Sequence, residues 1–142
     1  MKATLALLLS IAVAAPALAE TVSPSSGHAF PRTAEERFQL ESNLGHVQNV
    51  SNEVSSWCVY PAVTSGPRAI HVLASVPRGD AIQCFSQAVT SRASNAPPGD
   101  ASFATASGSS ADAVMHVTVP DQGALSICCD MTPGTVLQTI RY

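Results

Sequence analysis

The sequence has few charged residues, few aromatic residues and very little lysine. Only 12% of its 142 residues are Asp, Glu, Lys or Arg, and the formal net charge is −3. A negatively charged chain with seven basic residues lacks the positive surface that nucleic-acid phosphates require, so we expect no nucleic-acid partner. The low charge and the 46% hydrophobic content also exclude a disordered acidic or basic tail. The length predicts a single globular domain.

The sequence also lacks the short motifs that mark common catalytic and metal sites. It contains no Cys-x-x-Cys pair of the zinc-ribbon or thioredoxin kind. The run Ser107-Gly108-Ser109-Ser110 is not the G-x-S-x-G of a nucleophile elbow. Cys129 and Met131 have no histidine between them, as a blue-copper site of the cupredoxin type would require. We therefore expect no cofactor, no metal and no catalytic residues, and a role other than that of an enzyme.

The first nineteen residues have the layout of a secretory signal peptide. Lys2 supplies a positive charge, residues 3–15 form an apolar run, and Ala17 and Ala19 occupy the positions that signal peptidase reads. The apolar run is shorter than the ~20 residues of a membrane span. Cleavage before Glu20 would leave 123 residues with six arginines, no lysine and ten carboxylates. We expect a secreted or periplasmic bacterial protein with no membrane span in the mature chain, whose compartment permits disulfides.

Residues 20–43 read as a lead-in to the domain. Residues 20–32 are rich in Ser and Pro, and Thr33 to Glu36 fit a capping box, which predicts one short helix from Thr33 towards Asn43. Phe38 and Leu40 alternate with polar residues, which favours a strand instead, so both interpretations stay open. Residues 44–142 would then form a single β-sandwich domain.

From Gly45 onward the apolar residues recur with a period of two, as in half-buried strands. The segments Pro77–Asp80 and Pro120–Gly123 have the turn residues and the length of hairpin connections. The pattern predicts an all-β fold, an antiparallel β-sandwich or jelly roll with six to eight short strands. The residues expected to face the core are Ile70, Val72, Ala74 and Val76, then Met115, Val117 and Val119, then Leu125, Ile127, Cys129 and Met131.

Residues 91–112 consist almost entirely of Ser, Ala, Gly, Pro, Asn, Asp and Thr. A structureless loop of this length is unusual inside a compact domain. The segment Ala101–Ala106 can form one weak strand within it, with Phe103 as its anchor. The remainder reads as a long mobile loop, and such loops often carry binding sites.

The four cysteines, Cys58, Cys84, Cys128 and Cys129, all lie in predicted strands and are the disulfide candidates. Successive strand residues point to opposite faces, so Cys129 and Cys84 should face the core and Cys128 should face out, while the face of Cys58 is ambiguous. We favour a Cys58–Cys84 disulfide, with Cys84–Cys129 as the alternative. The first pairing would leave Cys128 and Cys129 to form a vicinal disulfide, or leave one of them free or bonded to another molecule.

Two alternatives to a purely structural role stay open. Cys128, Cys129 and Met131, together with a histidine on another strand, could hold a soft metal such as Cu(I) in a periplasmic metal or redox protein. His71 and His116 both lie opposite the apolar residues of their strands, and they could form a pair of metal ligands only if those strands are neighbours. A small hydrolase or hydrolase inhibitor with its site on residues 91–112 is the other alternative.

One resemblance links several of these segments. The order Gly45-His46-Val47-Gln48-Asn49, Trp57-Cys58, Ile82-Gln83-Cys84 and Cys128-Cys129 followed by Pro133-Gly134 and a final strand resembles a loose group of small exported bacterial proteins of unknown function. The resemblance covers residues 45–142 and implies a β-sandwich, with no activity assigned to the group. We therefore expect a non-catalytic binding or envelope-structural protein with an envelope or extracellular partner.

Overall fold

Alternating apolar residues build two antiparallel sheets that face one another across a shared core. The computed structural model describes residues 19–90 and 100–142 and contains eleven strands, more than the six to eight expected. The signal-peptide prediction falls on residues 1–19, of which 1–18 lie outside the described residues. Among the described residues, no helix has the length and apolar character to cross a bilayer.

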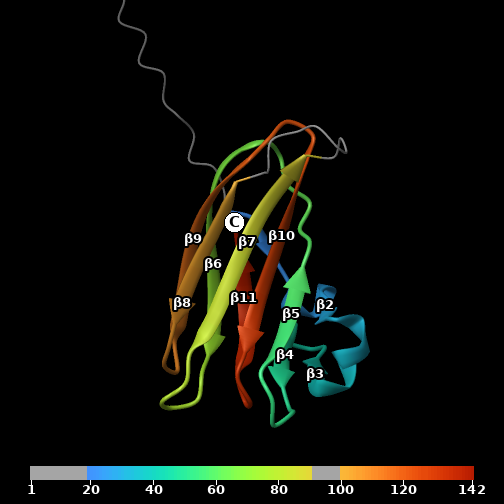
Figure 1. Cartoon of the computed structure of the whole chain (residues 1–142), viewed down its shortest axis with the longest axis vertical. Helices are drawn as coiled ribbons and strands as arrows, with labels where there is room; N and C mark the ends of the chain where they lie inside the picture. The colour runs from blue at the N-terminus through green and yellow to red at the C-terminus, as the bar shows by residue number, and fades with distance from the viewer. Residues whose placement is uncertain (1–18, 91–99) are drawn as a thin grey trace, which may run out of the picture.

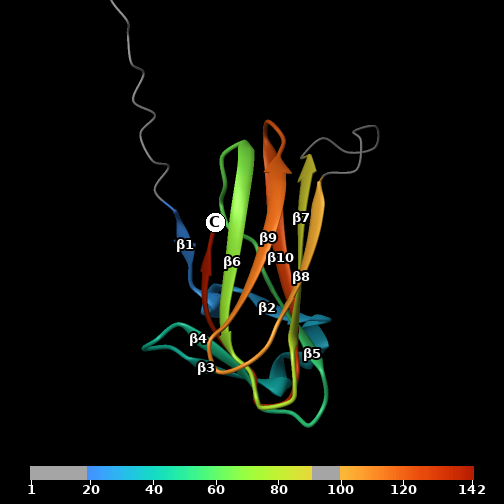
Figure 2. The same cartoon turned by 90° about the vertical axis from the view of Figure 1, so that its left-hand side faces the viewer.

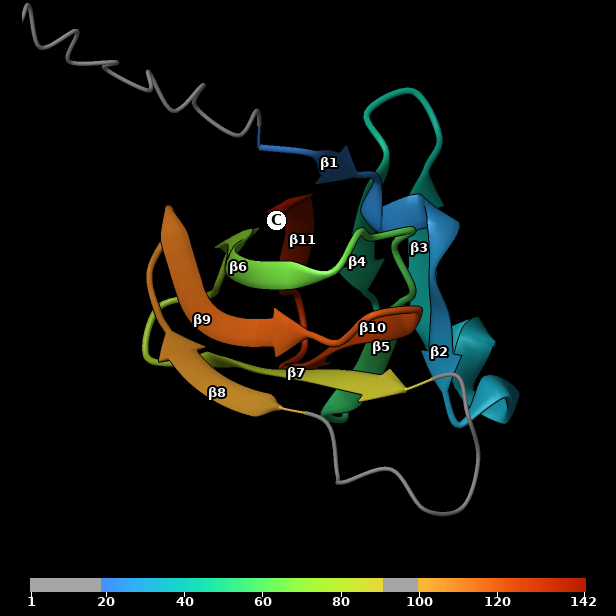
Figure 3. The same cartoon turned by 90° about the horizontal axis from the view of Figure 1, so that it is seen from above.

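The first sheet has the strand order β3-β4-β11-β6-β9, and β1 pairs with the end of β11 beyond β4. The second sheet has the order β2-β5-β10-β7-β8. Figure 1 shows β8, β7, β10 and β5 side by side from left to right, with the strands running along the long axis of the molecule, and Figure 3 shows the two layers from above. The first sheet comprises β1 (Thr21–Val22), β3 (Phe38–Glu41), β4 (His46–Asn49), β6 (Gly66–Ser75), β9 (Ala111–Val119) and β11 (Val136–Arg141). The second comprises β2 (His28–Phe30), β5 (Ser55–Val59), β7 (Ile82–Thr90), β8 (Ala101–Ala106) and β10 (Gly123–Met131).

The core consists of the inward-facing residues of both sheets, and every residue predicted to face inward is buried. Ile70, Met115 and Met131 are completely inaccessible to solvent. Burying a Val, Leu, Ile or Met side chain contributes about 1.5–3 kcal/mol, so this alternation is the main source of stability. The predicted antiparallel β-sandwich is confirmed.

The two predicted hairpins are wrong. Pro77–Asp80 leads from β6 in the first sheet to β7 in the second, and Pro120 leads from β9 to β10 in the same way. Turn residues specify that the chain reverses, whereas they do not specify whether the two strands hydrogen-bond or face one another across the core. Consecutive strands pair within one sheet at β3–β4 and at β7–β8.

The lead-in is part of the sandwich rather than a loose segment, because β1, β2 and β3 pair with β11, β5 and β4. In place of the predicted helix there is only a short 3-10 helix, η2 (Arg32–Arg37). It begins after Pro31 and has no side-chain cap, so the predicted capping box of Thr33 does not form. The chain then enters β3, where Phe38 packs against Trp57 with the ring centroids 4.9 Å apart. Strand pairing and this aromatic contact prevail over the helical signal.

The same N-terminal region contains a second short 3-10 helix, η1 (Pro24–Ser26). The buried indole nitrogen of Trp57 donates a hydrogen bond of 2.8 Å to the Pro24 carbonyl oxygen. The single tryptophan of the chain therefore ties this segment to the sandwich.

One side of the sandwich is closed where β8 and β9 lie beside each other (Figure 2). The backbone N–H of His116 donates to Ser102 Oγ at 3.2 Å, and the N–H of Thr118 donates to Asp100 Oδ2 at 2.7 Å. These side chains occupy the free edge of β9, which would otherwise offer unpaired donors to another chain. The expected strand Ala101–Ala106 is confirmed as β8.

Candidate functional site

Two disulfides join β10 to both of its neighbouring strands. Cys128 is bonded to Cys58 of β5, and Cys129 is bonded to Cys84 of β7. In each pair the two cysteines are register partners, with their Cα atoms 4.1 Å apart. Because consecutive strand residues point to opposite faces, the Cys84–Cys129 bond lies in the core and the Cys58–Cys128 bond lies on the outer face.

The favoured Cys58–Cys84 pairing is therefore wrong, and the alternative Cys84–Cys129 is the one formed. Cys58 and Cys84 lie on strands that β10 separates, and they point to opposite faces of the sheet. None of the four cysteines, all within the described residues, is free, so neither a vicinal disulfide nor an unpaired Cys128 is present. The predicted outward direction of Cys128 and inward direction of Cys84 and Cys129 are confirmed, since Cys128 is partly exposed and the other two are buried.

The outer face of this sheet carries an ordered set of side chains around the outer disulfide. We call it the aromatic face. Its middle row runs from strand to strand across the sheet, and the residues in register are Phe103, Phe85, Cys128, Cys58 and His28. A second row, in the same strand order, is Thr105, Gln83, Asp130, Ser56 and Phe30. On the side of the middle row away from the second row, Gln87 and Ser126 are in register. Tyr60 directly follows the last residue of β5.

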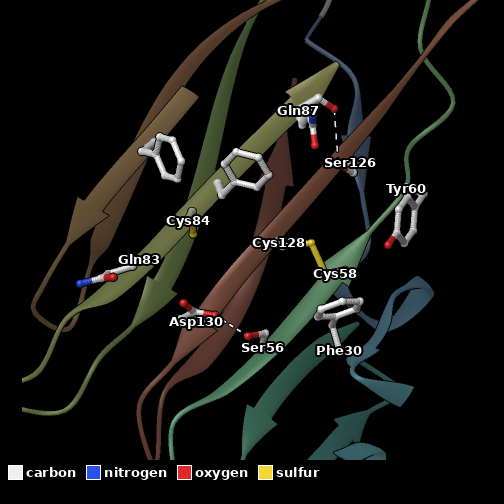
Figure 4. Close-up of a pocket in the computed structure, with 12 residues that line it drawn as sticks. Phe30, Ser56, Cys58, Tyr60, Gln83, Cys84, Gln87, Ser126, Cys128 and Asp130 are labelled. Atoms are coloured by element: carbon white, nitrogen blue, oxygen red, sulfur yellow. Dashed lines mark hydrogen bonds between the residues drawn. A yellow bond between two sulfur atoms is a disulfide. The ribbon is translucent and has the colours of Figure 1, made fainter. Parts of the chain in front are cut away.

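A groove of about 420 Å³ lies on the aromatic face, over the outer disulfide. Figure 4 shows Phe30 and Tyr60 on the β5 side of that disulfide and Gln83 on the other side. Phe103, Phe30 and Tyr60 are 77%, 63% and 56% exposed, which is unusual for side chains of this size. The Phe85 and Phe103 rings are 4.8 Å apart, and the His28 and Tyr60 rings stack 5.2 Å apart with 15° between their planes. Phe85 and Phe103 thus line one side of the groove and Phe30 and Tyr60 line the other, while His28 stacks on Tyr60 without lining the groove.

The polar groups of the groove are nearly all uncharged. Ser56 Oγ donates a hydrogen bond to Asp130 Oδ1, and Ser126 Oγ donates to the Gln87 carbonyl oxygen at 3.4 Å (Figure 4). Among the described residues, Asp130 is the only formally charged one that lines the groove, and no Lys or Arg lines it. The surface therefore combines apolar rings with uncharged donors and acceptors and one carboxylate.

Sequence reasoning missed the aromatic residues of this face. The sequence predicts Phe103 as the anchor of its strand, but the side chain points outward and is 77% exposed. The sequence of β7 does contain a sign of this exposed aromatic surface. Phe85 lies between Gln83 and Gln87, on the side of the strand opposite the buried residues Ile82 and Cys84. A single aromatic residue on the polar side of a strand is ordinary, whereas several that form one exposed patch are typical of an interaction surface.

The other three histidines, His46, His71 and His116, lie on the first sheet. β6 and β9 are neighbours, as a pair of metal ligands would require. His71 Nδ1 is instead 3.0 Å from Asp112 Oδ2 on the outer face of the first sheet. Both side chains are about 40% exposed, and neither lines the groove. His46 Nδ1 is 3.8 Å from Glu41 on the β3–β4 pair. Within residues 19–90 and 100–142, no three His, Cys, Asp or Glu side chains are grouped as a metal site requires.

The loop expected at 91–112 does not extend over residues 101–112, because these residues form β8, a turn and the start of β9. Residues 91–99 lie outside the described part of the chain.

In comparisons with known proteins, no family model, no curated protein and no solved structure matches this chain.

Proposed function

We propose that the mature chain is an exported, non-catalytic binding protein whose ligand lies on the aromatic face. The observation that carries the proposal is the groove of about 420 Å³, which Phe85 and Phe103 line on one side and Phe30 and Tyr60 line on the other. Aromatic side chains that project into water contribute little to folding, and they are the residue types that dominate binding energy at recognition surfaces.

The floor of the groove supports this proposal because it is covalently fixed. The disulfides of Cys128 and Cys129 hold β5, β10 and β7 together at one level of the sheet. A floor that cannot shift its register keeps the groove in one shape before the ligand arrives. Preorganisation of this kind lowers the entropy loss on binding.

The exported location rests on the signal-like segment and on the resemblance to small exported proteins. Two disulfides fit an oxidising compartment such as the periplasm or the cell exterior. Expression of residues 1–142 in a bacterial host should yield a protein that begins Glu20-Thr21-Val22 outside the cytoplasm. Retention of residues 1–19 on the exported protein, as seen by intact mass, would contradict cleavage before Glu20.

Chemical-shift mapping tests the binding site while the natural ligand is still unidentified. We suggest recording amide spectra of residues 20–142 with a library of small neutral organic fragments. Fragments that bind should perturb the amides of Gln83, Gln87, Ser126 and Asp130, which line the groove. Perturbations confined to the outer face of the first sheet, or none at all, would overturn the proposal.

Matched variants separate the groove from nonspecific apolar contact. Phe103→Ala and Tyr60→Ala each remove an exposed ring of the aromatic face and should abolish the perturbations. Leu44→Ala is the control, because Leu44 is 65% exposed in the turn between β3 and β4 of the other sheet. It should leave the perturbations unchanged.

The alternative functions have less support. A soft-metal site needs Cys128 and Cys129 as thiolates, whereas both are bonded to other cysteines. A hydrolase that works through a His–carboxylate pair needs that pair within a substrate pocket. The pairs His71–Asp112 and His46–Glu41 are partly exposed, and neither lines the groove.

A further inference from the structure

Resting on the proposed function, we propose that the ligand of the aromatic face is a neutral oligosaccharide lying across the strands. Three features of the face carry the inference. These are the separation of the two aromatic pairs, the neutral hydrogen-bonding groups between and beside them, and the lack of positive charge among the described residues that line the groove.

The aromatic pairs suit sugar rings because one face of a pyranose presents C–H groups that pack against an aromatic ring. Phe85 and Phe103 lie on β7 and β8, and Tyr60, which stacks on His28 of β2, lies just after β5. β10 runs between the two pairs. Since strands are about 4.8 Å apart, Phe85 and the end of β5 are separated by about 10 Å. A ligand that reaches both pairs is therefore longer than one sugar, which points to an oligomer.

The polar rows suit hydroxyl groups. The amides of Gln83 and Gln87 both donate and accept hydrogen bonds, as sugar hydroxyls do. The Asp130 carboxylate accepts the Ser56 hydroxyl and has further lone pairs free to accept from a ligand hydroxyl. A fatty-acyl chain in the same groove would remove water from these groups without replacing their hydrogen bonds, which is unfavourable.

The charge of the face argues against acidic ligands. Among the described residues, no Lys or Arg lines the groove, and the one charged residue that does, Asp130, is negative. Phosphate and carboxylate ligands are bound by Arg, Lys or clustered N–H donors, so nucleotides, anionic lipids and acidic glycans do not match it. The neutral polyhydroxylated class is the one whose apolar and polar parts both have counterparts here.

Calorimetric titration with defined sugars tests the inference. The probes are glucose, mannose and N-acetylglucosamine and the neutral linear oligomers of each, added to residues 20–142. At least one oligomer should bind more tightly than its monosaccharide, because only the oligomer reaches both aromatic pairs. Phe103→Ala and Tyr60→Ala should each weaken binding by about tenfold or more, equivalent to about 1.4 kcal/mol. Leu44→Ala should bind as the unmodified protein does.

The outcomes distinguish this inference from the proposed function. If fragments map to the aromatic face but no sugar of the panel binds, the binding function stands and the oligosaccharide is wrong. Tighter binding of an apolar ligand than of every oligomer overturns the inference in the same way, as does self-association of the chain that Phe103→Ala abolishes. If neither fragments nor sugars reach the face, the proposed function fails as well.

Discussion

Cys128 and Cys129 are consecutive residues of β10, yet their disulfides bind that strand to different neighbours on opposite faces of the sheet. One bond therefore belongs to the outer face and the other to the core. Together they fix the register of three adjacent strands, whose slippage by one residue would turn every side chain to the wrong face. The groove lies directly over this fixed region.

Removal of either disulfide should destabilise the protein. The bonds close segments of 70 and 45 residues, and the chain-entropy model assigns each about 4 kcal/mol. Cys84→Ala with Cys129→Ala should cost more than Cys58→Ala with Cys128→Ala, because it also leaves a cavity in the core. Urea unfolding, monitored through the fluorescence of Trp57, gives the free energy of unfolding of both double variants. Equal or reversed losses would contradict the core position of the inner bond.

The two disulfides should also differ in their reaction with a reductant. Cys128 is partly exposed, whereas Cys58, Cys84 and Cys129 are buried, so only the outer bond has an accessible cysteine. Thiol–disulfide exchange requires access to a sulfur atom, so a limiting amount of reductant should open the outer bond first. Alkylation of the native protein followed by peptide mass mapping should label Cys58 and Cys128. Label on Cys84 or Cys129 at the same stage would show that the order is wrong.

Asn49 should be the most sensitive polar position of the core. Its amide nitrogen donates to the carbonyl oxygens of Met131 at 2.7 Å and Glu53 at 2.8 Å, and its side-chain oxygen accepts from Ser51. Asn49→Ala leaves both carbonyls without this donor and should cost about 2–4 kcal/mol. Asn43→Ala, at an exposed position, should change the free energy of unfolding by less than about 0.5 kcal/mol. Similar effects for the two variants would count against the network.

Tyr142 should make stability fall at high pH. Burial raises the pKa of its phenol, the charge of Glu20 raises this pKa further, and Arg68 lowers it. Between the tyrosine pKa of the unfolded chain, about 10, and the higher one of the folded state, the folded protein binds more protons, so stability decreases as pH rises. Below that range the contribution is constant.

The Tyr60→Phe variant isolates this titration, because Tyr60 and Tyr142 are the two tyrosines of the chain. Tyrosinate absorbance should then report a pKa above that of free tyrosine, and Glu20→Gln should reduce it. A value at or below that of free tyrosine would refute the assignment.

The sequence predicts the faces of the strands well because period-two alternation is a local property. Ile70, Met115 and Leu125 are buried as their patterns require. Disulfide pairing depends instead on strand order, which local patterns do not contain, and this is why the sequence predicts the wrong partner for Cys58. The same limit explains why Pro77–Asp80 reads as a hairpin when it crosses between sheets.

The outward direction of Phe103 has a packing reason that the sequence alone does not reveal. β8 lies close to β9, and its inward positions hold Ser102, Ala104 and Ala106. Small side chains allow that approach, whereas a phenyl ring at those positions would not fit between the strands. The aromatic ring is therefore placed on the outer side, where it becomes part of the groove.

The central claim is that the aromatic face binds a ligand rather than stabilises the fold. The Phe103→Ala variant tests this claim most directly when its affinity for the neutral oligomers is measured together with its free energy of unfolding. The account predicts that affinity falls by about tenfold or more, while stability changes by less than about 1 kcal/mol. Undiminished affinity, no binding by the unmodified protein, or a loss of stability as large as that of a core variant would contradict it.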